Sequence, residues 1–324
     1  MQRPLAITLG EPGGVGPEIV VKALPSFQEQ PIVVVGDEPP LREALELTGS
    51  ALQMRKIQAP EEAIPGALNL LALGLIRSMR GLRRRPTALG GRASYEYIRQ
   101  AVELALRGRV RAITTAPISK EALRMAGLRW PGHTEMLAAL TGSKDYAMAF
   151  VGGPLKILLA TIHVPLRKVP SLIKKEELVR KIRLAHRAGM MFGLRRPHVA
   201  VAGLNPHAGE GGLFGREEIE EIAPAVAEAK RKGLRVSGPH PADVLFRRAY
   251  LGEVDVVLAM YHDQALGPLK MIAFDVGVNF TVGLPFVRTS PDHGTAYDIA
   301  WKAVASAESM KEALRLALRL SSAS

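Results

Sequence analysis

The chain of 324 residues contains no cysteine. It therefore has no disulfide framework, no thiolate zinc site and no cysteine nucleophile. The N-terminus carries only a short apolar run and lacks the pattern of a signal peptide. We therefore expect a cytoplasmic protein, a compartment with which the lack of disulfides is consistent.

Long apolar runs and aromatic residues are also scarce. The run at residues 67–76 is too short to cross a bilayer, so no membrane partner is expected. Aromatic residues make up 5% of the chain, and none is interleaved with the basic runs at 77–85, 174–175 and 195–196. Because single-stranded nucleic acid is bound by alternating cations and aromatic rings, no nucleic-acid partner is expected.

Acidic residues are fewer than basic ones, 31 Asp and Glu against 43 Lys and Arg, which gives a net charge of +12. This balance can attract phosphorylated small substrates, or it can simply keep the protein soluble. We interpret the basic runs themselves as solvated faces.

Three histidines follow short apolar segments that are typical of buried strands. The carboxyl ends of strands form the ligand-binding edge of open α/β sheets. Three imidazoles are enough for a metal site with positions left open for a substrate. They would favour Zn²⁺, with Co²⁺, Ni²⁺ or Mg²⁺ as alternatives. Unrelated loop histidines are the competing interpretation, but the shared context favours a metal site formed by His163, His207 and His262.

A glycine-rich turn joins an apparent strand at residues 5–9 to a helical pattern at 19–24. Glycine lets the backbone approach a ligand closely at the positive end of a helix. The turn is neither the GxGxxG fingerprint nor a P-loop. The alternation of strands and helices along the chain predicts an α/β fold with a largely parallel sheet.

Several motifs together resemble the 4-hydroxythreonine-4-phosphate dehydrogenase family of pyridoxal phosphate biosynthesis. Two segments, GVGPE and HGTAYDIA, also resemble the isocitrate and isopropylmalate dehydrogenases more distantly. The motifs occur in order between about residue 5 and about residue 305: GEPGGVGPE, GHTEML, ATIHVPL, LNPHAGEGGLFGREE, GPHPADVLF, MYHDQALGPLKM and VNFTVGLPFVRTSPDHGTAYDIA.

The resemblance implies a three-layer α/β/α fold with two subdomains and a cleft. It implies a cofactor-side subdomain at 1–125 and 284–324, and a metal, substrate and dimerisation subdomain at 126–283. It also implies a homodimer whose active sites are shared between subunits. We expect the hairpin at residues 146–161 to form the dimer contact, through Val151, Ile157, Leu158 and Leu159.

The resemblance also assigns roles to residues. The three histidines named above would bind the metal, one of them from the partner subunit. Asp243 is a candidate proton acceptor and Lys270 a second catalytic residue, although Asp243 could instead cap a helix that starts at Val244. Asp298 would bind the cofactor ribose, or it could stabilise a helix start. The implied substrate residues are His133, Thr134, Lys270, Asn279 and Arg288, and the implied cofactor residues are Gly13, Gly14, Gly16, Asp292, Gly294 and Asp298.

The implied reaction is the NAD-dependent, metal-assisted oxidation of 4-phosphohydroxy-L-threonine to 2-amino-3-oxo-4-phosphobutyrate, which then decarboxylates to 3-amino-2-oxopropyl phosphate. A close alternative is a dehydrogenase of a related sugar acid, 4-phosphothreonate or 4-phosphoerythronate. A phosphate-binding acyltransferase on the same scaffold, and a non-catalytic metal or nucleic-acid binder, are alternatives of other classes.

Overall fold

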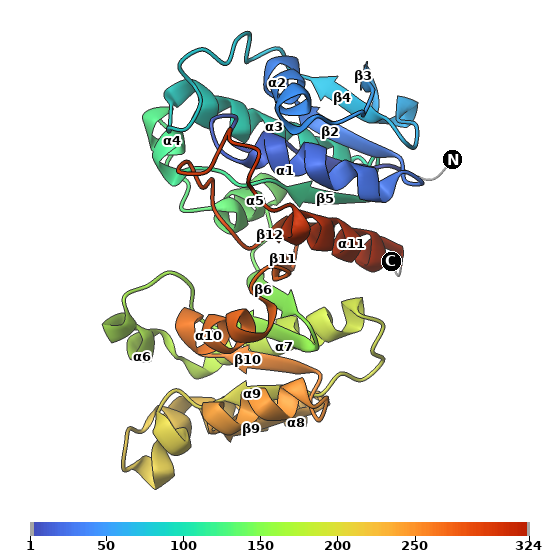
Figure 1. Ribbon diagram of the computed structural model, residues 1–324. Coiled ribbons are helices and arrows are strands. Elements are labelled where there is room, and N and C mark those ends of the chain that lie inside the picture. The colour runs from blue at the N-terminus through green and yellow to red at the C-terminus, as the bar shows by residue number, and fades with distance from the viewer. Residues whose placement is uncertain (1–2, 323–324) are drawn as a thin grey trace. The chain divides into compact units, whose positions relative to one another are not determined.

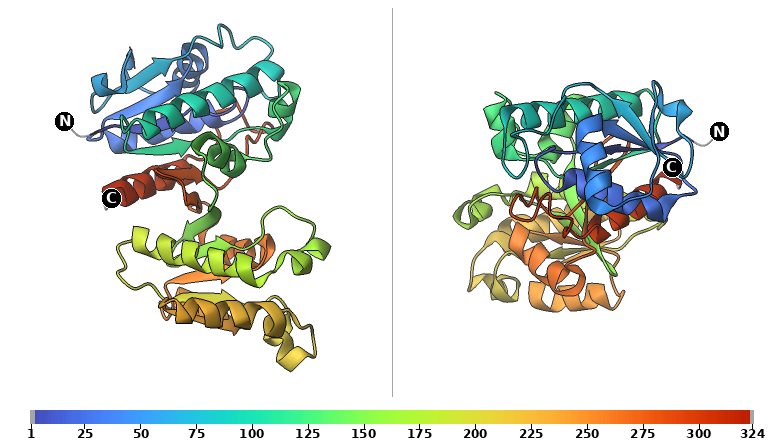
Figure 2. Two further views of the ribbon diagram at one scale, coloured as in Figure 1. Left: turned by 180° about the vertical axis from the view of Figure 1, so that it is seen from behind. Right: turned by 45° about the horizontal axis from the view of Figure 1, so that its top comes forward.

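The computed structural model describes residues 3–322, which divide into two compact units. Unit 1 comprises residues 3–144 and 284–322, and unit 2 comprises residues 145–283. In each unit a sheet carries helices on both faces (Figures 1 and 2). This confirms the expected three-layer α/β/α class. No helix in the described range combines the length and apolarity needed to span a bilayer.

The sheet of unit 1 is parallel, with the strand order β3-β4-β2-β1-β5-β12. The central strands β1 and β2 are mostly apolar and fully buried, because helices cover both of their faces. Helix α3 packs on one face, and α1 and α11 on the other (Figures 1 and 2). The bounds are β1 (Leu5–Thr8), β2 (Ile32–Gly36), β3 (Met54–Lys56), β4 (Leu68–Ala72), β5 (Ala112–Thr115), β12 (Val287–Pro291), α1 (Gly16–Ala23), α2 (Glu38–Thr48), α3 (Ala88–Leu106), α4 (Lys120–Met125), α5 (His133–Thr141) and α11 (Glu308–Ser322).

The sheet of unit 2 has the strand order β11-β6-β7-β10-β8-β9. Strand β6 is antiparallel to both of its neighbours, and the strands from β7 to β9 run parallel. Helices α7 and α8 cover one face, and α9 and α10 the other (Figures 1 and 2). The bounds are β6 (Ala147–Gly152), β7 (Leu155–Leu159), β8 (Val199–Ala202), β9 (Val236–His240), β10 (Val256–Ala259), β11 (Val278–Val282), α6 (Val169–Leu172), α7 (Lys175–Met191), α8 (Ala223–Arg231), α9 (Ala242–Tyr250) and α10 (His262–Ala273).

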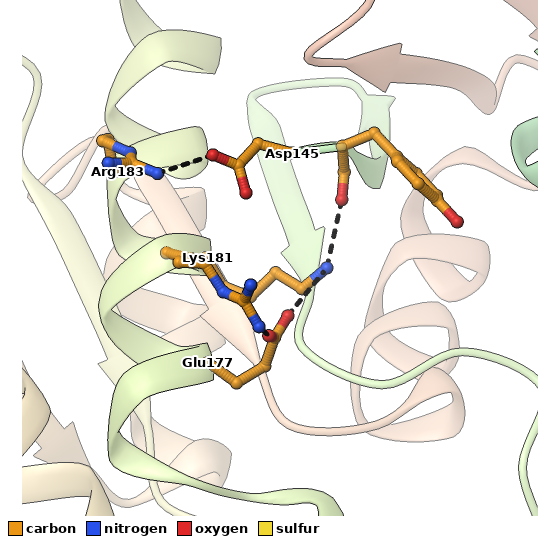
Figure 3. A network of polar contacts seen from close by, with 6 residues as sticks. Asp145, Glu177, Lys181 and Arg183 are labelled. Carbon is orange, nitrogen blue, oxygen red and sulfur yellow. Dashed lines mark hydrogen bonds and ion pairs between the residues drawn. The ribbon is translucent and has the colours of Figure 1, made fainter. Parts of the chain in front are cut away.

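Helix α7 holds the segment that leads into β6. Lys181 donates to the backbone carbonyl of Tyr146 at 3.1 Å and forms an ion pair with Glu177, while Arg183 contacts Asp145 at 2.8 Å (Figure 3). Gly283 lies against the same segment, because a Cβ there would come within 2.0 Å of the Asp145 carbonyl oxygen. Its φ of +102° is a second reason why the position needs glycine.

Two expectations about the subdomains need correction. Residues 126–144 lie in unit 1 rather than in the second subdomain, because α5 packs against α3. The hairpin β6–β7 is internal to the sheet of unit 2, and its residues Ile157, Leu158 and Leu159 are buried in that unit's own core. These three side chains are therefore not available for a contact with another subunit.

Residues 297–303 make turns and form no helix. Ala296, Trp301 and Ala303 have φ of 43°, 61° and 58°, which a right-handed helix cannot contain. The buried carboxylate of Glu18 accepts hydrogen bonds from the backbone N–H groups of Trp301 and Ala303 and so holds the turns in place.

Candidate functional site

The three predicted metal-binding histidines follow three adjacent parallel strands of unit 2. His163 comes after β7, His262 after β10 and His207 after β8, and these strands are neighbours in the order β7-β10-β8. Because parallel strands share their carboxyl edge, the fold places all three histidines along the same edge of the sheet.

The rings of two of these histidines lie close together and are tilted relative to each other. The ring centroids of His163 and His262 are 5.4 Å apart, with 40° between the ring planes. The Nδ1 atom of His262 is 2.7 Å from a carboxylate oxygen of Asp263, which orients the ring and leaves Nε2 for another partner. Both rings line a cavity of about 150 Å³, together with Thr161 and Tyr261. This volume corresponds to about five water molecules, at ~30 Å³ each, and is enough for a metal ion and one end of a small substrate.

His207 does not join this pair. No three histidine, aspartate or glutamate side chains within residues 3–322 lie close enough to hold one metal ion. His207 is exposed at the start of a left-handed turn, in which His207, Ala208 and Glu210 have φ of 52°, 53° and 41°. The Glu218 carboxylate supports the preceding chain by accepting from the backbone N–H of Asn205 at 2.8 Å. A site with three histidine ligands would therefore need a third imidazole in addition to those of His163 and His262.

Backbone strain marks the same positions. His163 has φ of 47° and His207 has φ of 52°, so both lie in the left-handed region that non-glycine residues avoid. Strained backbone of this kind concentrates at ligand-binding and catalytic positions. This feature is not visible in the sequence, and it favours a functional role for both histidines.

Unit 1 contains a second cluster of polar side chains, which lies around a buried arginine. Arg288 on β12 is only 2% exposed, and its Nε and one Nη donate to the Thr115 hydroxyl at 3.2 and 2.6 Å. Burial lowers the pKa of Arg288 to about 9, which the Glu135 carboxylate partly opposes. Burial, followed by the charge of Arg288, also holds the pKa of His133 well below its usual value. Arg288 therefore remains a cation at neutral pH, beside a neutral imidazole.

The neighbours of Arg288 carry polar atoms that still need partners. His133 Nε2 and Thr134 Oγ1 are buried, and neither has a hydrogen-bond partner among residues 3–322. Unpaired buried polar atoms are costly unless a ligand completes them. A guanidinium, an imidazole and a hydroxyl in one place suit a phosphate or carboxylate group. Three of the five expected substrate residues are thus brought together within unit 1.

The other two expected substrate residues belong to unit 2. Asn279 is buried on β11, and Lys270 lies on α10 with its ammonium 5.4 Å from the centre of the Phe274 ring. Asp243 is exposed in the first turn of α9. Since α9 begins at Ala242 and has Pro241 as its N-cap, Asp243 is not the cap of a helix starting at Val244.

The three expected cofactor glycines on the β1–α1 turn are enclosed by the protein itself. A Cβ at any of them would clash with neighbouring atoms, so the turn needs glycine whether or not a ligand is bound. A Cβ added to Gly294, by contrast, would meet no neighbouring atom within 4 Å, and Asp292 and Asp298 lie on the same turns at 292–305. The clashing distances are 2.3 Å to the Leu82 carbonyl oxygen for Gly13, 2.8 Å to Thr295 for Gly14 and 2.4 Å to the Leu9 carbonyl oxygen for Gly16.

Comparison with known proteins decides the family. A profile of the family described as "Pyridoxal phosphate biosynthetic protein PdxA" matches residues 28–317. The chain belongs to the PdxA family. It is 48% identical over 317 residues to the 4-hydroxythreonine-4-phosphate dehydrogenase of Aquifex aeolicus, and the match covers 98% of each chain.

Two further PdxA relatives are similar over nearly the whole chain. The D-threonate 4-phosphate dehydrogenase of Salmonella typhimurium is 44% identical over 324 residues, covering 98% of this chain and 99% of that protein. The crystal structure of 4-hydroxythreonine-4-phosphate dehydrogenase from Klebsiella pneumoniae matches with a TM-score of 0.91 and 44% identity, covering 99% of this chain and 100% of that one. The names of these relatives place the family among the oxidoreductases.

One buried carboxyl group of this PdxA chain has no role assigned from the sequence. Glu11 is fully buried at the end of β1, and its Oε2 accepts from the Tyr297 hydroxyl at 3.1 Å. Burial raises the pKa of Glu11 to about 7. The Glu11 side chain thereby links the glycine-rich turn to the turns at 292–305. The signal available in the sequence was a glutamate two residues after the apolar run at 5–9, at the start of a turn that contains three more glycines.

Proposed function

We propose that the chain catalyses the NAD-dependent, metal-assisted oxidation of 4-phosphohydroxy-L-threonine to 2-amino-3-oxo-4-phosphobutyrate, which loses CO2 to give 3-amino-2-oxopropyl phosphate. The name of the Aquifex aeolicus relative supports this substrate. The observation that carries the metal-assisted part is the pair formed by His163 and His262 over a small cavity.

The donor set fits a divalent ion. His163 and His262 would hold it, with Zn²⁺ favoured by imidazole ligands and Co²⁺, Ni²⁺ or Mg²⁺ as alternatives. Asp263 orients the His262 ring and fixes which nitrogen is left for the ion. When bound, the ion supplies Lewis acidity toward the substrate oxygen, and the nicotinamide supplies a hydride acceptor.

The residues of unit 1 would bind the anionic end of the substrate. Arg288 supplies a positive charge, because its guanidinium stays protonated at neutral pH. His133 and Thr134 would direct their unpaired atoms to the same anion. Burial of these groups excludes water, so each hydrogen bond to the substrate counts for more than it would on the surface.

The residues of unit 2 would orient and deprotonate the substrate. Asn279 offers an amide that can both donate and accept. Lys270 supplies a second cation on the helix that begins with His262. We assign Asp243 as the proton acceptor, since it is an exposed carboxylate and is not used as a helix cap. The cofactor would bind along the β1–α1 turn and the turns at 292–305, with Asp298 on the ribose.

The third imidazole leads us to infer a homodimer. We propose that His207 completes the metal site of the partner subunit, because it is exposed and does not meet His163 and His262 in its own chain. A groove of about 860 Å³ between α9 and α10 supplies a candidate contact surface, and Met271 on its wall is 85% exposed. Asp263 lines both this groove and the histidine cavity, so a subunit seated in the groove would reach the site.

A second candidate substrate is D-threonate 4-phosphate. The Salmonella typhimurium relative that carries this name is 44% identical, close to the 48% of the Aquifex aeolicus relative. The two substrates differ at a single position, where one has an amine and the other a hydroxyl. An acyltransferase would have no use for strand-end histidines and is disfavoured by the family.

Anaerobic turnover of the purified protein tests the proposal. Each substrate is offered with NAD and Zn²⁺ while the absorbance of the reduced cofactor is followed. We expect turnover of 4-phosphohydroxy-L-threonine that a chelator abolishes, and a large loss of kcat/KM in Arg288→Gln. A higher kcat/KM for D-threonate 4-phosphate would select the second candidate. Absence of reduced cofactor with both substrates would refute the assigned reaction.

A further inference from the structure

The arginine-rich segment at residues 77–85, which we call the arginine loop, is not simply a solvated face. Its last residues contact both of the segments assigned to the cofactor in unit 1. A Cβ on Gly13 would lie 2.3 Å from the Leu82 carbonyl oxygen and 2.9 Å from that of Arg85. The loop therefore forms a wall beside the glycine-rich turn.

Arg84 makes the connecting contacts. Its backbone N–H donates to the Gly13 carbonyl oxygen at 2.8 Å. Its guanidinium donates to the carbonyl oxygens of Asp298 at 3.2 Å and Tyr297 at 3.4 Å. One residue thus joins the glycine-rich turn to the turn that carries Asp298, and its guanidinium contacts the backbone of that aspartate.

The backbone of Arg84 is strained as well. Its φ of 62° lies in the left-handed region. The other non-glycine residues with positive φ in the described range are His163, three residues of the 207–210 turn, and three residues of 296–303. Each of those segments carries residues that the resemblance assigns to metal or cofactor. Arg84 is the exception in having no assignment, and strain of this kind points to a role in binding.

The charge of Arg84 is uncompensated. Arg83 is engaged by Glu43 and stacks on Trp301 at 5.7 Å, whereas Arg84 forms no ion pair with any residue in 3–322. Asp298 is exposed next to it and also forms no ion pair within that range. An exposed carboxylate at a ribose repels a 2′-phosphate, while a nearby arginine accommodates one. Here the Arg84 guanidinium lies against the backbone carbonyl of Asp298, so a ribose bound by the Asp298 carboxylate would also be near a positive charge.

We propose that Arg84 determines how the dinucleotide site treats the 2′ position of the adenosine ribose. Its charge offsets the repulsion that Asp298 exerts on a 2′-phosphate, so it supports binding of NADP and contributes little to binding of NAD. The proposal rests on the proposed function, because it requires a dinucleotide at these turns.

Three variants separate charge from structure. Arg84→Gly removes the charge and accepts the left-handed backbone without strain. Arg84→Lys keeps the charge. Arg85→Ala is the matched control, since Arg85 is an exposed arginine of the same loop whose side chain contacts only the Gly81 carbonyl oxygen.

Calorimetric titration of each metal-free protein with NAD, NADP and 2′-AMP measures binding without turnover. We expect Arg84→Gly to weaken binding of NADP and 2′-AMP about tenfold while that of NAD changes less than about twofold. Arg84→Lys and Arg85→Ala should keep the wild-type ratio of the NADP and NAD dissociation constants. Raising the salt concentration should shrink the difference, since the charges are exposed.

Equal weakening of NAD and NADP in Arg84→Gly would overturn the proposal, because it would show that Arg84 only supports the loop. An unchanged ratio in Arg84→Gly would overturn it as well. If the wild-type protein bound neither dinucleotide, the cofactor in the proposed function would be refuted together with this inference. If NAD bound and all variants had the wild-type ratio of the NADP and NAD dissociation constants, only the inference on Arg84 would be refuted.

Discussion

Complementation between inactive subunits tests the arrangement of the three histidines most directly. In the proposed dimer, each subunit would provide the neighbouring rings of His163 and His262 to one metal site. If His207 of the other subunit completes that site, then a dimer of one His207→Ala chain and one His163→Ala chain contains one complete set. Its other site lacks both the His163 and the His207 contributions. Each homodimer alone has no complete site.

The geometry sets the expected amount of recovery. A purified heterodimer of these two variants has one of its two sites intact, so it should show about half of the wild-type kcat per dimer and bind about one metal ion instead of two. The assay co-expresses the two chains with different tags, isolates the heterodimer by sequential affinity steps, and measures both turnover and metal content. Far-ultraviolet circular dichroism of each homodimer checks that the variants fold.

A second combination is the control. A heterodimer of His163→Ala and His262→Ala breaks the pair in both subunits, so it should remain inactive and hold no metal. Activity in this control would mean that His163 and His262 serve different chains. A well-folded His207→Ala and His163→Ala heterodimer without activity would refute the sharing of His207 between subunits.

The remaining predictions concern unit 1. Because burial raises the folded pKa of Glu11 to about 7, the stability contributed by its protonated form is complete below pH 4.5 and is lost as the pH rises toward 7. Urea unfolding should show Glu11→Gln gaining up to about 3 kcal/mol relative to wild type between pH 4.5 and pH 8, and a parallel pH dependence in both proteins would contradict this. Gly13→Ala should lower the free energy of unfolding by roughly 1–3 kcal/mol or more through its clash with Leu82, whereas Gly294→Ala, with open space around it, should leave it nearly unchanged. If Asp298 binds the ribose, kcat/KM should be higher for NAD than for NADP, and a preference for NADP would refute that role.

The placement of the three histidines along one sheet edge was predictable because it depends on strand ends. His163, His207 and His262 each follow an apolar run, and parallel strands bring such residues to one edge whatever the details of the loops. The buried cation Arg288 was predictable only through the resemblance, since a single arginine after an apolar strand has no sequence signature. The local apolar pattern thus predicted the strands and helices that form the layers, and the sheet edge at which the three histidines lie.

The parts that could not be predicted depend on contacts far apart in the sequence. The turns at 292–305 are held by Glu18, on α1, which accepts hydrogen bonds from the backbone N–H groups of Trp301 and Ala303. Arg84 was assigned to a solvated face because its contacts with Gly13 and Asp298 join residues that are distant in the chain. The hydrophobic pattern of a sequence predicts which side chains are buried, but it does not predict which distant residues form hydrogen bonds with each other.

The left-handed turn that begins at His207 bears on the proposed dimer. Each non-glycine residue in this conformation costs about 1–2 kcal/mol, so the φ values of His207, Ala208 and Glu210 together cost several kcal/mol. That is a considerable share of the roughly 5–15 kcal/mol by which folded domains are stable. A turn required only for folding would be served better by glycine or asparagine at position 207. Histidine there adds strain, gains no burial, and presents an imidazole to the exterior of the chain, which is where a ligand for a neighbouring subunit has to be.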